Sequence, residues 1–294
     1  MAAMLILAFS DYLPQAQRLA ASLNLPVKEV FLHHFPDGES LVRLPVDLPE
    51  HVIVCRSLNQ PNDKLIELML TANTARQLGA KRLTLVAPYL CYMRQDIANQ
   101  PGEAVSQRIV GQLLANLFDD VITVDPHLHR ISSLDQAIPL QNAVSLTAAE
   151  PIARFLKQQL THAVLLGPDD ESEQWVAAIA DKIGFDYAVA TKRRSGDKNV
   201  SVTLPAFDFA DKSVVIIDDM ASTGRTLAQA AELLMAAGAG QVCAVVTHPL
   251  FCGDAEQHIN KAGVGHIWSS DSISHSTACI YLNELLARAV RVIM

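Results

Sequence analysis

The sequence predicts an α/β protein built from two similar domains, each a mainly parallel sheet flanked by helices. Short runs of Val, Ile and Leu alternate with longer amphipathic stretches along all 294 residues. Near-continuous apolar runs are typical of parallel strands that are buried on both faces, and strands that alternate with helices form parallel sheets with right-handed crossovers. The pattern occurs twice, and the chain length agrees with about two domains.

The individual elements follow from this alternation. The expected strands are Met4–Phe9, Val52–Ser57, Arg82–Ala87, Val121–Asp125, Ala163–Gly167, Tyr187–Thr191, Ser213–Asp218 and Gln241–Thr247. The expected helices are Tyr12–Leu23, Asn62–Leu78, Ser106–Leu117, Ala149–Leu160, Glu173–Ile183, Thr226–Ala237 and Ile280–Val290. The helix that begins at Asn62 places Leu65, Leu68 and Met69 on one face, and Gly79 ends it.

We expect the first domain to span residues 1–143 and the second to span residues 144–294, with the last helix packing back on the first domain. The stretch Ser132–Ala149 lacks strong periodicity and contains Pro139, so we interpret it as a linker. Functional groups are expected at the carboxyl ends of the strands, as in other parallel sheets.

Composition excludes several classes of protein. Lys and Arg number 23 against 31 Asp and Glu, and the net charge of −8 argues against a nucleic-acid binder. Half of the residues are hydrophobic, which excludes intrinsic disorder. No run approaches the ~18 apolar residues that span a membrane, and Met1–Phe9 has no basic flank or cleavage site of a signal peptide. The five cysteines form no C-x-x-C pair, which is typical of reduced cysteines in a cytoplasmic protein.

A segment of the second half predicts a binding site for a sugar phosphate. The strand that ends at Asp218 and Asp219 leads into a polar turn and then a helix. The turn and the helix start comprise Ser222, Thr223, Gly224, Arg225 and Thr226. Hydroxyls, a glycine and free N–H groups at a helix start suit a phosphate, and two carboxylates could hold sugar hydroxyls directly or through a divalent cation. The alternative interpretation is a simple helix cap.

Two basic residues precede a polar loop. Lys192 and Arg194 lie two apart on an extended segment, so they project to the same side and could clamp a transferring diphosphoryl group. The following residues Ser195–Pro205 suit a lid that closes over a site. The alternative is a solvated basic turn. His127 and His129 could likewise indicate a transition-metal site, although no cysteine or third histidine is near them in the sequence.

Five segments in order resemble the ribose-phosphate diphosphokinase (phosphoribosyl diphosphate synthetase) family. They are Phe35-Pro-Asp-Gly-Glu39, Pro88–Asp96, Asp125-Pro-His127, Lys192-Arg-Arg194 and Asp218–Thr226. The chain looks like a divergent, short member, and the resemblance implies two tandem phosphoribosyltransferase-like domains. It also implies an enzyme that transfers the diphosphoryl group of Mg-ATP to the anomeric hydroxyl of ribose 5-phosphate, giving 5-phosphoribosyl 1-diphosphate and AMP.

The resemblance further implies roles for individual residues. Lys192 and Arg194 match catalytic positions, and His127 and Asp169 match positions that face the Mg²⁺–triphosphate. The expected ATP-binding residues are Phe35, Asp37, Glu39, Arg94, Gln95 and Asp96. The expected ribose-phosphate-binding residues are Asp218, Asp219, Ser222, Thr223, Gly224, Arg225 and Thr226. Members of the family share active sites between subunits, so the resemblance implies a homo-oligomer.

The chain departs from the family pattern at three places. Ser222 replaces an Asp and Arg225 replaces a Gly, which leaves the exact pentose phosphate open. Asp170–Glu173 replaces a small residue and a glycine pair, and adds negative charge. Ile97–Val105 lacks the basic residues of allosterically regulated members, so we expect their regulatory site to be absent or altered. Two other functions stay open: a phosphoribosyltransferase acting on a base, and a non-catalytic regulatory homologue.

Overall fold

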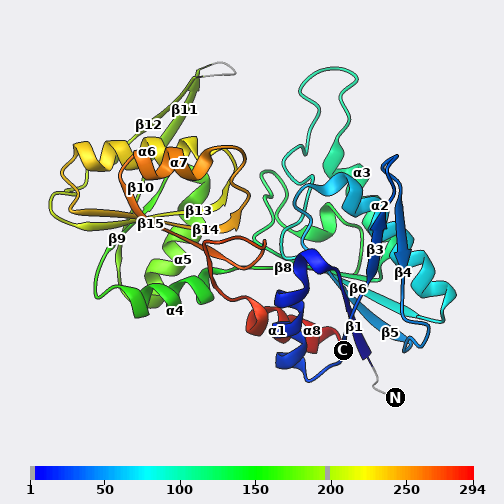
Figure 1. The fold of residues 1–294 in the computed structure, drawn as a ribbon. Helices are drawn as coiled ribbons and strands as arrows, with labels where there is room; N and C mark the ends of the chain where they lie inside the picture. Colours follow the sequence, from blue (N-terminus) through cyan, green and yellow to red (C-terminus); the bar gives the residue numbers. More distant parts are fainter. Residues whose placement is uncertain (1–3, 196–198) are drawn as a thin grey trace. The chain divides into compact units, whose positions relative to one another are not determined.

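The computed structural model describes residues 4–195 and 199–294, without the side chains of residues 193–195 and 199–201. The chain divides into two compact units (Figure 1). Unit 1 comprises Met1–Thr147, Ser272–Ser274 and Asn283–Met294, and unit 2 comprises Ala148–Asp271 and His275–Leu282. The division after Thr147 lies a few residues beyond the expected boundary at 143/144.

Unit 1 is a parallel sheet of six strands with helices on both faces. Its strands are β1 (Met4–Ala8), β2 (Val27–Glu29), β5 (His51–Cys55), β6 (Arg82–Val86), β7 (Asp120–Val124) and β8 (Asn142–Leu146), in the order β2-β1-β5-β6-β7-β8. Helices α1 (Leu13–Leu23) and α8 (Asn283–Ile293) pack together on one face, and α2 (Pro61–Gln77) and α3 (Ser106–Leu117) cover the other (Figure 1). Two 3₁₀ turns, η1 (Ser10–Tyr12) and η2 (Leu134–Gln136), complete the unit.

Unit 2 repeats the same plan. Its strands are β9 (Val164–Gly167), β10 (Asp186–Val189), β13 (Ser213–Ala221), β14 (Gln241–Pro249), β15 (Val264–Ser270) and β16 (Ala278–Ile280), in the order β10-β9-β13-β14-β15-β16 and all parallel. Helices α4 (Ala149–Gln159) and α5 (Glu173–Ile183) lie on one face, and α6 (Arg225–Ala236) and α7 (Ala255–Lys261) lie on the other (Figure 1). The 3₁₀ turn η3 (Asp170–Ser172) precedes α5.

Each unit also carries an antiparallel hairpin between its second and third sheet strands. In unit 1 the hairpin consists of β3 (Phe31–His34) and β4 (Ser40–Arg43), and in unit 2 of β11 (Thr191–Ser195) and β12 (Asn199–Thr203). The strand expected over Tyr187–Thr191 is therefore two strands, because β10 ends at Val189 and β11 begins at Thr191. The expected loop over Ser195–Pro205 is also wrong in part, since β12 occupies its middle; residues 196–198 lie outside the described residues.

Two further expectations need correction. The presumed linker Ser132–Ala149 contains η2 and the edge strand β8, which pairs with β7 over Asn142–Leu146. The last helix begins at Asn283 rather than Ile280, because residues 278–280 form β16 beside β15. Its buried residues Leu286, Ala287 and Val290 belong to the face that packs on α1.

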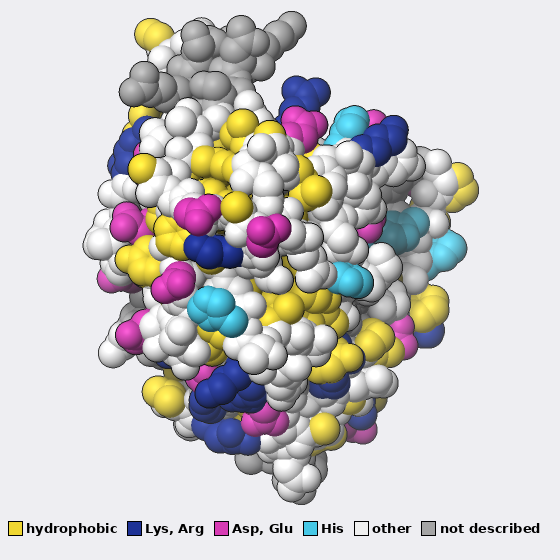
Figure 2. All heavy atoms as spheres, turned by 90° about the vertical axis from the view of Figure 1, so that its left-hand side faces the viewer, with side chains coloured by type: hydrophobic (Ala, Val, Ile, Leu, Met, Phe, Trp, Pro, Cys, Tyr) yellow, Lys and Arg dark blue, Asp and Glu magenta, His cyan; other side chains and the backbone are white. Residues whose placement is uncertain are grey.

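Charges of both signs are interspersed on one face of the molecule (Figure 2). On the face drawn in Figure 2, small groups of Lys and Arg side chains alternate with Asp and Glu side chains. This mixture agrees with the argument from net charge against a nucleic-acid-binding face. A search of the described helices finds none with the length and apolar character needed to cross a bilayer.

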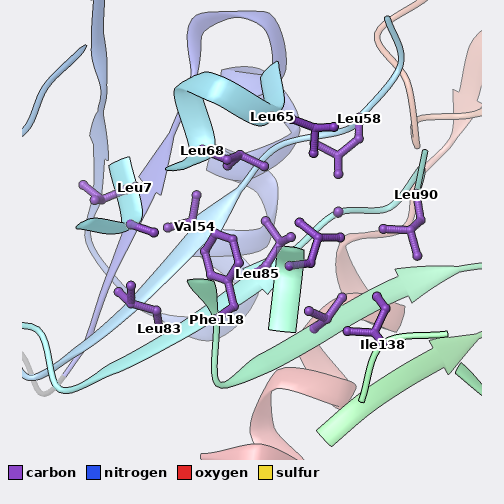
Figure 3. Packing of buried hydrophobic residues seen from close by; sticks show 14 of the residues in the cluster. Leu7, Val54, Leu58, Leu65, Leu68, Leu83, Leu85, Leu90, Phe118 and Ile138 are labelled. Carbon is purple, nitrogen blue, oxygen red and sulfur yellow. The ribbon is translucent and has the colours of Figure 1, made fainter. Parts of the chain in front are cut away.

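The core of unit 1 lies between its sheet and the α2–α3 layer. Alternate residues of the strands point to this side, so Leu7, Val54 and Leu85 from three neighbouring strands meet Leu65 and Leu68 of α2 (Figure 3). The intervening strand residues are buried on the opposite face. Burial on both faces explains why these strands read as continuous apolar runs in the sequence.

Candidate active site

The segment predicted to bind the sugar phosphate runs from β13 into α6, and β13 is longer than expected. β13 continues to Ala221, so Asp218 and Asp219 lie inside the strand rather than at its end. Successive strand residues point to opposite faces of a sheet, and accordingly Asp219 is buried whereas Asp218 is half-buried. The backbone N–H of Asp219 donates to Asp218 Oδ1 at 3.0 Å.

Gly224 fixes the turn that joins β13 to α6. It is the N-cap of α6 with φ +70°, and a Cβ atom there would lie 2.8 Å from Ile259 Cδ1 of α7. The loop between β14 and α7 holds the turn by two hydrogen bonds. The N–H of Phe251 donates to Ala221 O and the N–H of Cys252 donates to Ser222 O, both at 2.8 Å. This packing leaves Thr223 and Arg225 exposed beside the free N–H groups of the helix start.

Lys192 and Asp169 meet in unit 2. Asp169 follows β9 and Lys192 lies on β11, and Lys192 Nζ donates to Asp169 Oδ2 at 3.0 Å. Both side chains are largely buried, with 16% and 14% of their surfaces exposed. Arg194 lies two residues further along β11, opposite Val200, and its side chain is outside the described set.

The acidic stretch after Asp169 has a structural explanation. Asp169 and Ser172 form a capping box, in which Asp169 Oδ1 accepts from the Ser172 N–H at 3.2 Å. Asp170, Glu171 and Glu173 are exposed in the first turns that follow. Negative side chains at this end of a helix interact favourably with its dipole. The departure from the family pattern is therefore compatible with the fold of this loop.

Burial and neighbouring carboxylates raise the pKa of Asp218 well above its usual value. Burial is the largest cause, Asp219 and Asp169 add to it, and Lys192 acts in the opposite direction. Asp169 and Asp218 thus lie near the ammonium group of Lys192, and Asp219 lies next to Asp218 in the second half of β13. Oxygen ligands of this kind suit Mg²⁺, and a bound divalent cation would relieve their mutual repulsion.

In unit 1, Phe35, Asp37 and Glu39 form the exposed tip of the β3–β4 hairpin. The Phe35 N–H donates to Glu39 O at 2.8 Å, and the Glu39 N–H donates to Asp37 Oδ1 at 3.2 Å. Phe35 keeps 40% of its surface exposed and contacts the ring of His33 edge-on. The exposed ring of Phe35 could stack on a nucleobase. The carboxylates of Asp37 and Glu39 could accept hydrogen bonds from the amino group of the base or from the ribose hydroxyls.

The segment Arg94–Asp96 follows β6 and packs on the start of α3. The Gln107 N–H donates to Gln95 O at 3.2 Å, and Arg94 is exposed. Asp96 is buried and forms an ion pair with Arg130 at 2.6 Å. Its Oδ2 atom has no hydrogen-bond partner within the described chain. This carboxylate is therefore a buried, ion-paired group rather than an ordinary surface charge.

His127 lies just beyond β7, after a strained residue. Asp125 is buried and has φ +37°, which is uncommon for a residue other than glycine. The rings of His127 and His129 meet edge-on with their centroids 4.0 Å apart. Strain of this kind is often found where a backbone positions functional groups.

The sequence analysis missed a network of buried charges in unit 1. Arg56 follows β5, and its guanidinium contacts Asp11 beyond β1 and Glu67 on α2. Local pattern offered no signal for Glu67, because it lies outside the apolar face that Leu65 and Leu68 give to this helix. Its contacts with His34 and Ser40, 33 and 27 residues away in the chain, could not be read from local pattern.

Comparison with known proteins gives the family. The N-terminal domain of ribose phosphate pyrophosphokinase matches residues 4–117, and the phosphoribosyl transferase domain matches residues 141–272. Ribose-phosphate pyrophosphokinase from Methanopyrus kandleri is 32% identical over 291 residues, which cover 98% of each chain. The chain belongs to the ribose-phosphate pyrophosphokinase family. The pyrophosphokinase from Saccharolobus solfataricus is 33% identical over 267 residues, covering 88% of this chain and 89% of the relative.

The family fold extends over the whole chain. The crystal structure of phosphoribosylpyrophosphate synthetase from Mycobacterium smegmatis superposes with a TM-score of 0.82, covering 99% of this chain and 98% of that one at 24% identity. The predicted class of two tandem phosphoribosyltransferase-like α/β domains is confirmed.

Proposed function

We propose that this pyrophosphokinase transfers the diphosphoryl group of Mg-ATP to the anomeric hydroxyl of ribose 5-phosphate, giving 5-phosphoribosyl 1-diphosphate and AMP. Family membership supports the reaction, and one structural observation carries it: Lys192 meets Asp169 beside Asp218. This cluster lies at the carboxyl ends of β9 and β13, where the strand order of unit 2 reverses. Ligands of open parallel sheets bind at such switch points.

The proposed chemistry needs positioning and charge more than covalent help from the protein. The anomeric oxygen attacks the β-phosphorus, the bond from this phosphorus to the α,β-bridging oxygen breaks, and AMP leaves with the electron pair while the hydroxyl loses its proton. Lys192 and Arg194 neutralise charge on the transferring group. Asp218 and Asp219 hold the sugar hydroxyls. The 5-phosphate binds the turn of Ser222, Thr223, Gly224, Arg225 and Thr226 at the start of α6.

ATP binds to side chains of unit 1. Phe35 stacks on the adenine, and the polar contacts come from Asp37, Glu39, Arg94, Gln95 and Asp96. His127 of unit 1 and Asp169 of unit 2 are the residues that would hold Mg²⁺, the metal expected for the family. When bound, the ion supplies positive charge to the phosphate oxygens.

We also propose a cytoplasmic homo-oligomer in which subunits share active sites. The exposed hairpin tip around Phe35 supports sharing, and five cysteines that form no disulfide within the described residues suit a reducing compartment. Mixing a Glu39→Ala variant with a Lys192→Ala variant tests it. If sites are shared, the mixture recovers about a quarter of wild-type activity as subunits exchange, by random assortment of defective groups. Activity no higher than that of the separate variants argues against sharing.

The decisive experiment incubates the protein with Mg-ATP and ribose 5-phosphate and measures AMP. AMP formation that depends on the sugar phosphate supports the proposal. If the protein instead joins a base to 5-phosphoribosyl 1-diphosphate, it is a transferase, and if it only alters the rate of an active pyrophosphokinase, it is a regulatory homologue. Parallel assays with other pentose phosphates show whether Ser222 and Arg225 change the preferred sugar.

Replacing Lys192 by Ala is expected to lower kcat by about a hundredfold to a thousandfold, because the variant loses a preorganised positive charge next to the transferring group. Binding of ATP, measured by calorimetry, should persist. Lys182→Ala is the matched control, since Lys182 is an exposed lysine of α5 in the same unit. Wild-type turnover in Lys192→Ala would remove Lys192 from the catalytic groups.

A further inference from the structure

The switch point of unit 1, which corresponds to the site of unit 2, is occupied by the protein's own charges. The strand order of unit 1 reverses between β1 and β5, and Arg56 lies there with only 5% of its side chain exposed. Its guanidinium lies 3.9 Å from the centre of the Phe9 ring, and Nε donates to Asp11 Oδ1 at 3.2 Å. Lys64 Nζ contacts the same aspartate at 2.7 Å.

Glu67 is the buried anion of this network. It lies on α2 with 1% of its side chain exposed, and Arg56 Nη1 donates to its Oε2 at 2.5 Å. Burial alone would raise the pKa of Glu67, but hydrogen bonds from Arg56, His34 and Ser40 lower it overall. Burying a carboxylate costs several kcal/mol of folding free energy unless it is fully paired. An apolar side chain at this position would pack without that cost. The charge therefore calls for another explanation.

The second oxygen of Glu67 gives that explanation, because it holds the neck of the β3–β4 hairpin. Ser40 Oγ donates to Oε1 at 3.0 Å, and His34 Nε2 lies 2.8 Å from the same atom. His34 ends β3, Ser40 begins β4, and the two are paired in the hairpin register. The intervening residues Phe35–Glu39 are all exposed. One carboxylate thus joins both ends of the loop to Arg56 and the sheet.

We propose that Glu67 is a positioning residue for the nucleotide: it holds the Phe35–Glu39 loop in the conformation that binds ATP. This inference rests on the proposed function. A loop that is tethered only at its strands populates many conformations, and the apparent dissociation constant rises in inverse proportion to the fraction that can bind. Fastening both ends of the neck to a buried ion pair raises this fraction before the ligand arrives.

Steady-state kinetics of Glu67→Gln and Ser40→Ala test the proposal. Both keep the side-chain size nearly unchanged, and each removes part of the clamp. We expect the KM for ATP to rise about tenfold in Glu67→Gln and about threefold in Ser40→Ala, with kcat and the KM for ribose 5-phosphate within about twofold of wild type. Ser40→Ala deletes one partly exposed contact, so it keeps the test decisive if Glu67→Gln does not fold.

Asp120→Asn is the matched control. Asp120 is a buried carboxylate of the same unit, paired with Arg82 and Thr84. It begins β7 and so lies at the amino ends of the parallel strands, whereas Arg56 follows the carboxyl end of β5. Asp120→Asn should lower stability without changing the KM for ATP. The proposal is overturned if both clamp variants keep a wild-type KM for ATP, or if Asp120→Asn raises it equally.

Calorimetry with ATP alone separates this proposal from the reaction. Weaker ATP binding in the clamp variants than in Asp120→Asn supports the positioning role even if the wild type forms no AMP, in which case only the proposed function fails. Equal affinity overturns the positioning role even if AMP is formed, and no ATP binding by the wild type overturns both. Hydrogen exchange at the Phe35 and Gly38 amides, which donate within the loop, should quicken in the clamp variants only.

Discussion

At Asp218, binding and stability make opposite demands on one side chain. Burial, Asp219 and Asp169 raise its pKa well above the usual value, so folding takes up a proton at any pH between the ordinary pKa and the raised one. The stability that Asp218 contributes is therefore present at acidic pH and is lost as the pH rises through this window. In the proposed function, the ionised form of this carboxylate is the one that holds the sugar hydroxyls.

Asp218→Asn should raise the melting temperature at pH 7–8 and abolish turnover. The gain should shrink as the pH falls towards the ordinary pKa of an aspartate, about 4, where the wild-type side chain is neutral as well. Thermal unfolding from pH 4 to 8 without metal or substrate measures this. Asp181→Asn, at an exposed position of α5, should show no such trend. A variant that is less stable than the wild type at pH 8 would contradict the assigned direction.

Many of the candidate residues could be named from local motifs. Each motif places polar or charged residues next to one another in a loop that follows a strand. Lys192 and Asp169 were both named from sequence, and the structure adds their contact. Glu67 could not be named, because its role depends on partners brought together only by the hairpin and α2. Local pattern identifies candidate groups, whereas tertiary structure identifies what holds them.

At the scale of elements, the contact between α6 and α7 determines the shape of the turn that joins β13 to α6. Gly224→Ala places a Cβ 2.8 Å from Ile259 Cδ1 and 3.1 Å from Ala255 O, in a backbone with φ +70°. We expect a loss of about 2–4 kcal/mol in stability and at least a tenfold rise in the KM for ribose 5-phosphate, with ATP binding unchanged. Denaturant titration and kinetics measure these effects.

Gly184→Ala provides the control for that change. Gly184 has a nearly identical φ of +72° at the C-cap of α5, but a Cβ there meets nothing within 4 Å. It should show the cost of the left-handed backbone alone, about 1 kcal/mol, and leave the KM for ribose 5-phosphate unchanged. Equal KM values for the two variants would show that the clash with α7 does not shape the turn.

Buried central strands and longer helices were predictable because their apolar runs are strong. The ranges of α3 and α5 agree with the expected ones. The sheet strands β2, β8, β15 and β16 were missed. Three of them are edge strands, and in β8 no residue is fully buried. The fourth, β15 (Val264–Ser270), lies inside the sheet, but its middle residues are exposed or half-buried and its sequence has no continuous apolar run. The hairpin strand β11 reads as polar because it carries Lys192 and its basic neighbours. Edge strands need no continuous apolar pattern, so periodicity does not reveal them.

At the scale of the whole molecule, one topology is used twice with different outcomes. Both sheets follow the same order, and both insert a hairpin between the second and third strands. In unit 2 the switch point carries acidic groups and Lys192, whereas in unit 1 it carries the Arg56–Glu67 ion pair. Site residues, rather than the fold, distinguish the functions of the two halves.

The last helix contributes to the stability of the unit that begins the chain. Leu286 of α8 is buried in unit 1, and Ser22 of α1 donates to Glu284 at 2.6 Å. Leu286→Ala should destabilise unit 1 by about 2–5 kcal/mol and leave unit 2 largely unaffected, as measured by hydrogen exchange resolved along the chain. Val292→Ala on the same helix should cost less than about 0.5 kcal/mol, because Val292 is 86% exposed. Equal loss of protection in both units would contradict this assignment.

The return of α8 to α1 also sets an order of events on the ribosome. Every residue of unit 2 is synthesised before Asn283, so the second unit can finish its core while the first still lacks one helix of its own. Until α8 is made, the α1 face that it covers is exposed in the nascent unit 1. A chain that stops between Leu282 and Asn283 would hold all of unit 2 but would leave unit 1 without α8.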